Sequence, residues 1–228
     1  MRIAALVPMK GHSERVPNKN LQLFDGKPLC EWILRTLINV EEIERIYVNT
    51  DSKEIAFTVT AVSDKIEVID RPEQLRGDYV SMNRILEHDL QQTDAGIYMQ
   101  THATNPLLTA NTIALALKAF RDGTKQKEHD SLFTATGYQT RFYRNDGTPV
   151  NHNPEELLPT QHLPILFEEN SNLYIFTKES FSNTGGRMGK TPGLFEMNKI
   201  EAIDIDNWPD FHLAEAIKKS GILDNYDK

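Results

Sequence analysis

The 228-residue sequence predicts an α/β protein with a mostly parallel, doubly wound sheet. Short apolar runs of strand length alternate along the chain with segments in which apolar residues recur at helical spacing. Strands separated by helices are typical of parallel sheets that carry helices on both faces. Apolar residues make up 39% and charged residues 25%, as in an ordinary globular domain. We therefore expect one domain, residues 1–228, with a sizeable core.

The elements can be justified in order along the chain. The first strand is the apolar run Ile3 to Val7, and the next has alternating Ile46 and Val48. Thr109 is a candidate N-cap for the helix that follows it. The predicted strands are 3–7, 45–49, 66–69, 96–100, 131–136, 172–177 and 200–205. The predicted helices are 29–40, 53–62, 82–90, 111–120 and 209–219.

Residues 137–169 interrupt this alternation. The segment contains Asp146-Gly147, which predicts a hairpin turn, and prolines at 149, 154, 159 and 164. It is an inserted irregular arm that serves as a lid, a dimerisation arm or a plain surface excursion.

Composition narrows the functional classes. The formal net charge of −8 argues against a nucleic-acid partner. The sequence contains no run of about eighteen apolar residues, so we expect no membrane-spanning helix. Because the sequence starts directly with a predicted strand, we also expect no signal peptide. Cys30 is the single cysteine and there is no HExxH motif, which fits a cytoplasmic protein without a zinc site.

A cluster of cations follows the first strand. Lys10, Arg15 and Lys19 lie in one loop, and Gly11 and Ser13 let its backbone approach a ligand closely. Phosphates are the usual anions bound by loops at the carboxyl ends of α/β strands. The alternative is a solvated, charged turn.

This loop resembles the opening loop of the CMP-sialic acid synthetases (acylneuraminate cytidylyltransferases), whose signature is roughly Ala-Arg-x-x-Ser-x-x-x-Pro-x-Lys-Asn. The positions in register are Met9, Lys10, Ser13, Pro17, Lys19 and Asn20. Lys10 replaces the usual arginine, which keeps the charge and loses the planar fork. The resemblance implies a Rossmann-like nucleotidyltransferase fold that binds CTP. It places Lys10 and Ser13 at the β- and γ-phosphates, Lys19 near the α-phosphate and Asn20 near the cytosine, with Gly11 between them.

A pair of carboxylates near the C-terminus is the second signal. Asp204 and Asp206 are two residues apart in a predicted strand, so both side chains point to one side. They suit Mg²⁺, although they are also placed to cap the next helix. The family carries an Asp-x-Asp pair here, followed by an acid such as Asp210, and the resemblance implies Mg²⁺ bound by Asp204 and Asp206.

Three further segments resemble the family. Asn49-Thr50-Asp51, Arg71-Pro72 and Leu75-x-x-Asp78 match its Ser-Thr-Asp and Arg-Pro-x-x-Leu-x-x-Asp patterns. The resemblance gives Arg71 a role in reading the cytosine and places residues 80–82, with Ser81, beside the base and ribose. As alternatives, Thr50-Asp51 caps the helix at 53 and Asp78 caps the helix at 82.

The sugar-facing part departs from the family. Gln100 is in the position of a residue that touches the acceptor sugar, but two residues are inserted after it. Glu168 and Glu169 occur where arginine-containing patterns are usual, and their charge would repel a sugar carboxylate. The cations that can pair with that carboxylate are Arg141, Arg144, Arg187 and Lys190.

The implied reaction is the transfer of CMP from CTP to the anomeric hydroxyl of a sialic-acid-like (nonulosonic) sugar acid, with release of pyrophosphate. Lys10, Lys19 and Asp206 are the expected catalytic residues, with Mg²⁺ as the cofactor. The resemblance also implies a homodimer. Two alternatives are a nucleotidyl- or glycosyltransferase for a different sugar and a non-catalytic nucleotide-sugar sensor or scaffold.

Overall fold

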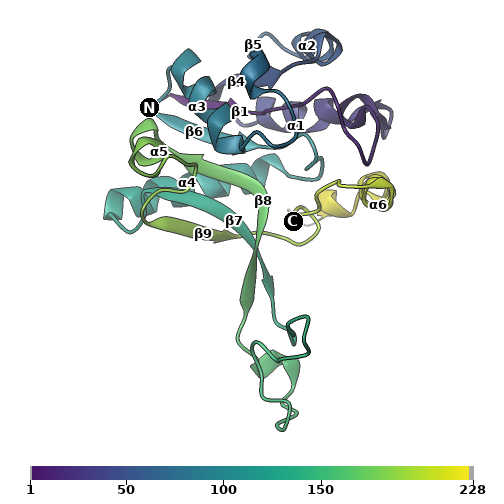
Figure 1. The fold of residues 1–228 in the computed structure, drawn as a ribbon, viewed down its shortest axis with the longest axis vertical. Coiled ribbons are helices and arrows are strands. Elements are labelled where there is room, and N and C mark those ends of the chain that lie inside the picture. Colours follow the sequence, from purple (N-terminus) through teal and green to yellow (C-terminus); the bar gives the residue numbers. More distant parts are fainter. Residues whose placement is uncertain (1, 226–228) are drawn as a thin grey trace.

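The computed structural model describes residues 2–225 and contains a seven-stranded sheet in the order β5-β4-β1-β6-β8-β7-β9 (Figure 1). The strands of this sheet are β1 (Ile3–Leu6), β4 (Ile43–Thr50), β5 (Ile66–Asp70), β6 (Ile97–Thr101), β7 (Ser131–Tyr138), β8 (Leu166–Phe176) and β9 (Pro192–Glu196). The helices are α1 (Leu29–Ile38), α2 (Lys53–Thr60), α3 (Met82–Gln92), α4 (Ala110–Gln126), α5 (Lys178–Thr184) and α6 (Trp208–Ser220). β2 (Leu23–Phe24) and β3 (Lys27–Pro28) form a separate hairpin.

The predicted fold class is confirmed. The half of the sheet formed by β5, β4, β1 and β6 is parallel throughout. Only β8 runs against its neighbours, pairing antiparallel with β6 and β7, while β9 pairs parallel with β7. The sheet is therefore parallel from β5 to β6, and β8 is its antiparallel strand.

Helices cover both faces of the sheet. Because strand side chains alternate, Ile3 and Ala5 share a core with buried residues of α1, α2 and α4, while Ala4 and Leu6 pack with α3 and α5 on the other face. The helix α6 buries Phe211 and Ala214 in a third cluster with Phe24 and Leu29. Within the described residues, no helix is both long and apolar enough to span a bilayer.

One predicted strand is wrong. Residues 200–205 form a turn and an extended stretch outside the sheet, and the last strand is β9, which was not predicted. Ile205 is buried beside α6, and its N–H donates to Thr104 O at 2.9 Å. The apolar residues at 200, 203 and 205 thus cover α6. The helix α5 was also not predicted, and α4 extends six residues beyond the predicted end at Phe120.

The helix caps decide two alternatives. Thr109 caps α4 as predicted and accepts from Thr112 N–H at 3.2 Å. Ser52 caps α2 by accepting from Ile55 N–H, so the Thr50-Asp51 capping hypothesis is wrong. The residue at the N-cap of α3 is Ser81, so Asp78 does not cap this helix.

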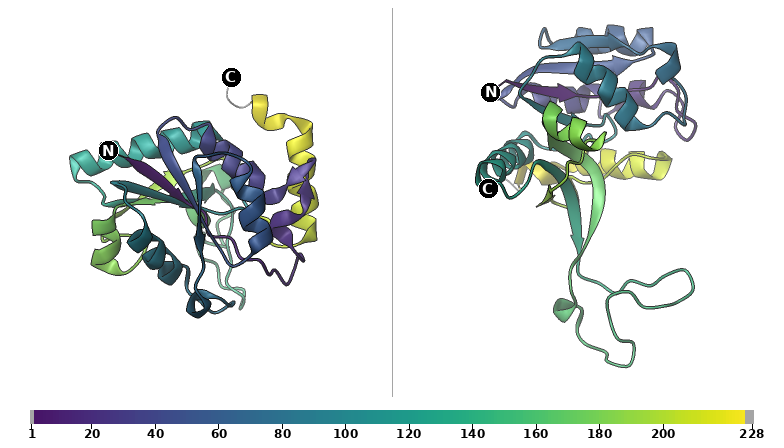
Figure 2. Two further views of the ribbon diagram at one scale, coloured as in Figure 1. Left: turned by 90° about the horizontal axis from the view of Figure 1, so that it is seen from above. Right: turned by 60° about the vertical axis from the view of Figure 1, so that its left-hand side comes forward.

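The irregular segment projects away from the body of the molecule (Figures 1 and 2). The predicted bounds of 137–169 are too wide, because residues 137–138 belong to β7 and residues 166–169 belong to β8. From here on we call residues 139–165, between these two strands, the arm. The turn at Asp146-Gly147 is present, with Gly147 at a φ of 83° and its N–H donating to Arg144 O at 2.9 Å. The arm therefore contacts the rest of the domain mainly at its base.

Candidate active site

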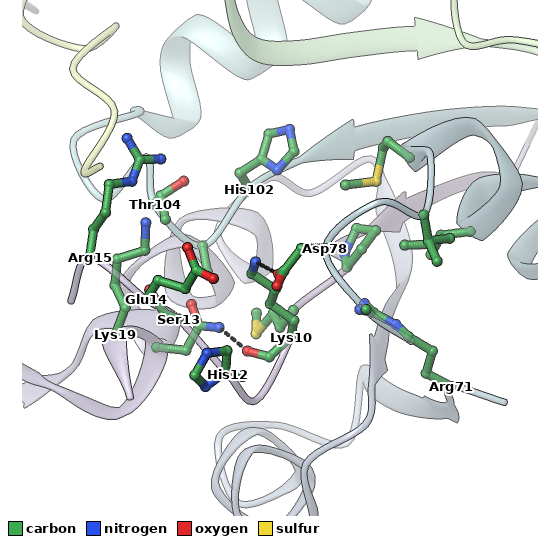
Figure 3. Close-up of a pocket in the computed structure, with 18 residues that line it drawn as sticks. Lys10, His12, Ser13, Glu14, Arg15, Lys19, Arg71, Asp78, His102 and Thr104 are labelled. Atoms are coloured by element: carbon green, nitrogen blue, oxygen red, sulfur yellow. Dashed lines mark hydrogen bonds and ion pairs between the residues drawn. The ribbon is translucent and has the colours of Figure 1, made fainter. Parts of the chain in front are cut away.

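A cavity of about 380 Å³ opens beside the loop that follows β1 (Figure 3). Loops after β1, β5 and β6 supply its walls, as expected at the carboxyl edge of a parallel sheet. Among the described residues that line it are four cations (Lys10, Arg15, Lys19 and Arg71) and two carboxylates (Glu14 and Asp78). In a chain with a net charge of −8, this local excess of positive charge favours an anionic ligand.

Hydrogen bonds fix the shape of the loop after β1. Gly11 N–H donates to Asp51 Oδ1 at 2.7 Å, and Asn20 Nδ2 donates to Lys10 O at 3.0 Å. A Cβ at Gly11 would lie 2.9 Å from Ser52 Cβ, so glycine is needed for this close approach to α2. Asp51 and Gly11 therefore position the loop.

Lys10 and Asp78 face each other across the cavity. Lys10 Nζ lies 2.6 Å from Asp78 Oδ1, and both side chains are about half exposed (Figure 3). The hydrogen bond and charge of Lys10 lower the pKa of Asp78. An exposed pair of this kind is weak, so an entering phosphate can compete with Asp78 for Lys10.

A buried network holds Arg71 at the cavity wall. Arg71 Nε donates to Asn49 Oδ1 at 2.6 Å and Nη2 donates to Asn49 O at 2.9 Å. Asn49 Nδ2 in turn donates to Asp89 Oδ1 at 2.5 Å. Asp89 is fully buried on α3, and burial raises its pKa to about 6. The guanidinium orientation is thus set from beneath by β4 and α3.

Lys19 connects the cavity to the acidic pair. Its Nζ donates to Ile205 O at 2.5 Å. Burial lowers the pKa of Lys19, while the charges of Asp204 and Asp206 oppose this effect. Arg15 Nη2 lies 2.6 Å from Asp206 Oδ1. Both acids therefore lie beside cations of the loop after β1.

The surroundings of Asp204 and Asp206 bear on whether this acidic pair can hold a metal ion. Burial raises the pKa of Asp204, and the like charge of Asp206 acts in the same direction, so a cation would be favourable between them. Asn207, not the acidic pair, is the N-cap of α6: its Oδ1 accepts from Asp210 N–H, and Asp210 completes the capping box by accepting from Asn207 N–H. Within residues 2–225 no three His, Cys, Asp or Glu side chains gather as a metal site. The two carboxylates are hard oxygen donors of the kind that Mg²⁺ takes, and by themselves they would leave the coordination of such an ion incomplete.

A second cavity of about 410 Å³ adjoins the first, and Met82 lines both. Gln100 is fully buried between them, with Oε1 accepting from Arg187 Nη1 at 2.6 Å and Nε2 lying 3.0 Å from His102 Nε2. Burial and the charges of Arg187 and Lys19 lower the pKa of His102 to about 4, so this side chain is neutral at pH 7.

The predicted site residues fall into four groups by position. Lys10, Ser13, Lys19, Asn20 and Arg71 line the first cavity. Ser81 lines the second cavity, whereas Gln100 is buried between the two. Gly11, Asp204 and Asp206 are outside both linings, although the two acids lie beside Lys19.

Sequence reasoning missed two residues at this site. His102 lines the first cavity, and Asp89 supports Arg71 from below. The insertion after Gln100 could have drawn attention to His102. Asp89 gave no such sign, because it occurs within an ordinary helical pattern.

Comparison with known proteins gives a family. Residues 4–222 match the family model described as Cytidylyltransferase. The chain is 27% identical over 217 residues to N-acylneuraminate cytidylyltransferase A of Danio rerio, covering 91% of this chain and 49% of that protein. It is 25% identical over 230 residues to pseudaminic acid cytidylyltransferase of Campylobacter jejuni, covering 96% and 97% of the two chains. The chain thus spans about half of the first relative and nearly all of the second.

Two solved structures share the fold. A CMP:2-keto-3-deoxy-manno-octonic acid synthetase in complex with CTP aligns with a TM-score of 0.70 and 13% identity, covering 97% of this chain and 100% of the other. A 4-diphosphocytidyl-2C-methyl-D-erythritol synthase of Anaerococcus prevotii aligns with a TM-score of 0.67 and 14% identity, covering 96% of each chain.

Proposed function

This chain belongs to the cytidylyltransferase family, and from that premise we propose that it transfers CMP from CTP to a sialic-acid-like (nonulosonic) sugar acid. The family makes it a nucleotidyltransferase that uses CTP. The observation that carries the proposal is the cationic cavity whose Lys19 also contacts the segment with Asp204 and Asp206. The cations of this cavity can neutralise the charge of a triphosphate, and the two acids beside them can bind a metal ion close to it.

The reaction requires positioning and charge neutralisation more than covalent catalysis. The anomeric oxygen of the acceptor forms a bond to the α-phosphorus as the bond to the departing pyrophosphate breaks, and the hydroxyl proton is released. Lys10 and Lys19 offset the charge of the triphosphate, and Arg71 and Asn20 orient the cytosine. Binding the phosphates also requires Lys10 to exchange Asp78 for a phosphate oxygen.

We propose Mg²⁺ as the cofactor, held by Asp204 and Asp206. When bound, it supplies positive charge that stabilises the transferring phosphate. Lys19 interacts electrostatically with both acids and donates to Ile205 O between them, so an ion held by the pair would lie beside the cations of the loop after β1. Arg15 must release Asp206, at least in part, for this carboxylate to bind the ion.

Two observations bear on the acceptor. The relatives are named for N-acylneuraminate and pseudaminic acid, which supports an acid of this class. The insertion after Gln100 and the pair Glu168-Glu169 favour a second candidate, a nucleotidyltransferase of the same kind with a different sugar acceptor. A non-catalytic sensor is disfavoured because Lys19, Asp204 and Asp206 are all present.

Pyrophosphate release tests the proposal. The four nucleoside triphosphates are assayed with Mg²⁺ against N-acetylneuraminic acid, pseudaminic acid and neutral sugars. Release with CTP and a nonulosonic acid is expected. Release only with CTP and a neutral sugar would move the chain to the second candidate, and CTP binding without turnover on any sugar would favour the sensor.

We also propose that the arm mediates a homodimer. It exposes several large apolar side chains to solvent: Tyr143, Val150, Leu157, Leu158 and Ile165. Exposed apolar side chains grouped on one projection indicate an interaction surface. Sedimentation equilibrium is expected to give twice the mass of one chain, and a mass near one chain would contradict the dimer.

A further inference from the structure

The second cavity has a simple charge pattern. Among the described residues that line it, Arg187 is the one cation and Glu169 is the one anion. Small or uncharged side chains make up the rest, including Ser81, Asn83 and Thr184. Because Met82 lines this cavity and the nucleotide cavity, a ligand here lies next to bound nucleotide.

Arg187 is held rigidly at the cavity wall. Its guanidinium carbon lies 3.6 Å from the centre of the Tyr174 ring, and Nη1 donates to Gln100 Oε1 at 2.6 Å. The side chain remains 19% exposed. A guanidinium has five N–H donors in a planar fork that matches a carboxylate, and stacking on an aromatic ring reduces the entropy lost when it binds. Arg187 is therefore a preorganised cation with donors left for a ligand.

The neighbouring glutamates do not block this cation. Glu169 Oε1 lies 4.0 Å from Arg187 Nη2, beyond hydrogen-bond distance, and it accepts a hydrogen bond from the Tyr174 hydroxyl. Glu168 is adjacent in β8 and points to the other face, where it interacts with Tyr138. Only one of the two negative charges thus faces the cavity, and the Tyr174 hydroxyl already engages it.

A chain of hydrogen bonds ties Arg187 to the nucleotide cavity. Arginine can only donate, so Gln100 must present Oε1 to Arg187 and its Nε2 group to His102. His102 Nε2 then accepts, which leaves the proton of the neutral imidazole on Nδ1. The position of Arg187 is consequently fixed relative to His102, which lines the nucleotide cavity.

We propose that Arg187 binds the carboxylate of the acceptor sugar in the second cavity and so determines the preference for a sugar acid over a neutral sugar. This inference rests on the proposed function. It assigns the cation that replaces the arginines absent from residues 168–172. Gln100 acts through Arg187 as a positioning residue.

The other candidate cations are less well placed. Arg141 Nη2 donates to Leu158 O within the arm, and Arg144 is exposed at its hairpin turn. Lys190 is exposed three residues beyond Arg187. Among the described residues, none of these three side chains lines either cavity of its own chain. In the proposed dimer, the arm of the second copy is a rival source of a cation.

Steady-state kinetics of Arg187→Met and Arg187→Lys test the assignment. The assay uses CTP with N-acetylneuraminic acid or pseudaminic acid, whichever turns over, and with its uncharged carboxamide. In Arg187→Met we expect the KM for the acid to rise roughly 10- to 100-fold and the KM for CTP to change less than about twofold. In Arg187→Lys the KM for the acid should rise less, because lysine keeps the positive charge although it lacks the planar fork of the guanidinium.

The carboxamide separates binding from folding. Wild-type protein should prefer the acid to its carboxamide, and Arg187→Met should lose most of that preference, which a merely structural defect would not cause. Lys190→Met is the matched control and should keep it. Full preference in Arg187→Met, with loss of preference in Arg141→Met or Arg144→Met, would overturn the assignment while leaving the proposed function intact. CTP binding without turnover of any acid by the wild type would overturn the function and this inference together.

Discussion

The nucleotide cavity and the acceptor cavity are built in different ways. The first takes Lys10, Arg15 and Lys19 from one loop after β1, at the edge of the parallel half of the sheet. The second takes its charged residues from β8 and from the loop after α5, in the antiparallel half. Under the proposed assignment, one local motif binds the phosphates and separate segments bind the acceptor. Substitutions in the second cavity would then change acceptor binding without altering the loop after β1.

Removing the cation that links the two ends of the nucleotide site should have the largest effect. In Lys19→Met we expect kcat/KM to fall roughly 10²- to 10³-fold, because the charge that offsets the triphosphate and orients the acidic pair is lost. Pyrophosphate release measures this. Lys53→Met, at an exposed position on α2, is the control. Near wild-type activity in Lys19→Met would contradict the proposal that the first cavity binds the triphosphate.

Loss of one acidic ligand should have the next largest effect. We expect Asp206→Asn to reduce kcat roughly 100-fold and to raise the Mg²⁺ concentration needed for half-maximal rate, because one hard oxygen ligand becomes neutral. A Mg²⁺ titration of the rate measures both. Asp94→Asn, which alters the exposed pair with Arg2, is the control. An unchanged Mg²⁺ requirement in Asp206→Asn would place the metal elsewhere.

Asp89, which supports Arg71 through Asn49, should affect the pH dependence of protein stability. Burial raises the pKa of Asp89 to about 6, so between pH 4 and 6 the folded protein holds a proton that the unfolded chain has released. The contribution of Asp89 to the free energy of unfolding should therefore fall as pH rises through this range and should be constant above it. His88 and Arg71 are the charged or titratable groups nearest to Asp89.

Asp89→Asn removes this titration and keeps the hydrogen bond to Asn49. Between pH 4 and 6, we expect the free energy of unfolding of the variant to rise relative to that of the wild type by about 1–3 kcal/mol. Urea unfolding at several pH values measures the difference. Asp122→Asn, at an exposed position on α4, should run parallel to the wild type. A variant that tracks the wild type at every pH would show that Asp89 has an ordinary pKa.

The smallest effect is expected from substitution of Glu169 in the second cavity. Glu169→Gln removes the negative charge 4.0 Å from Arg187, so the KM for the sugar acid should fall about two- to fivefold. Glu168→Gln, on the opposite face of β8, should leave this KM unchanged. A higher KM in Glu169→Gln would mean that this carboxylate itself binds the sugar.

The sequence predicted the fold class and the first cavity for a physical reason. Phosphate binding depends on residues close together in one loop, and buried parallel strands give continuous apolar runs. The strand predicted at 200–205 failed because an extended segment packed on α6 has the same apolar spacing as a strand. β9 starts with Pro192, which an edge strand tolerates but which obscures the pattern.

The acceptor side could not be assembled from sequence. Arg187 was one of four candidate cations, and no local feature distinguishes it from Lys190. Its position depends on Tyr174 and Gln100, which are 13 and 87 positions away in the chain. Likewise, only strand alternation in the folded sheet separates the environment of Glu168 from that of Glu169.

The division between the two cavities is tested most directly by equilibrium binding. Calorimetry would measure the affinities of a non-hydrolysable CTP analogue and of the sugar acid for wild type, Lys19→Met and Arg187→Met. We expect Lys19→Met to weaken binding of the CTP analogue and Arg187→Met to weaken binding of the acid to the protein loaded with that analogue. Weaker binding of one and the same ligand in both variants, or unchanged acid binding in Arg187→Met, would contradict separate cavities for nucleotide and acceptor.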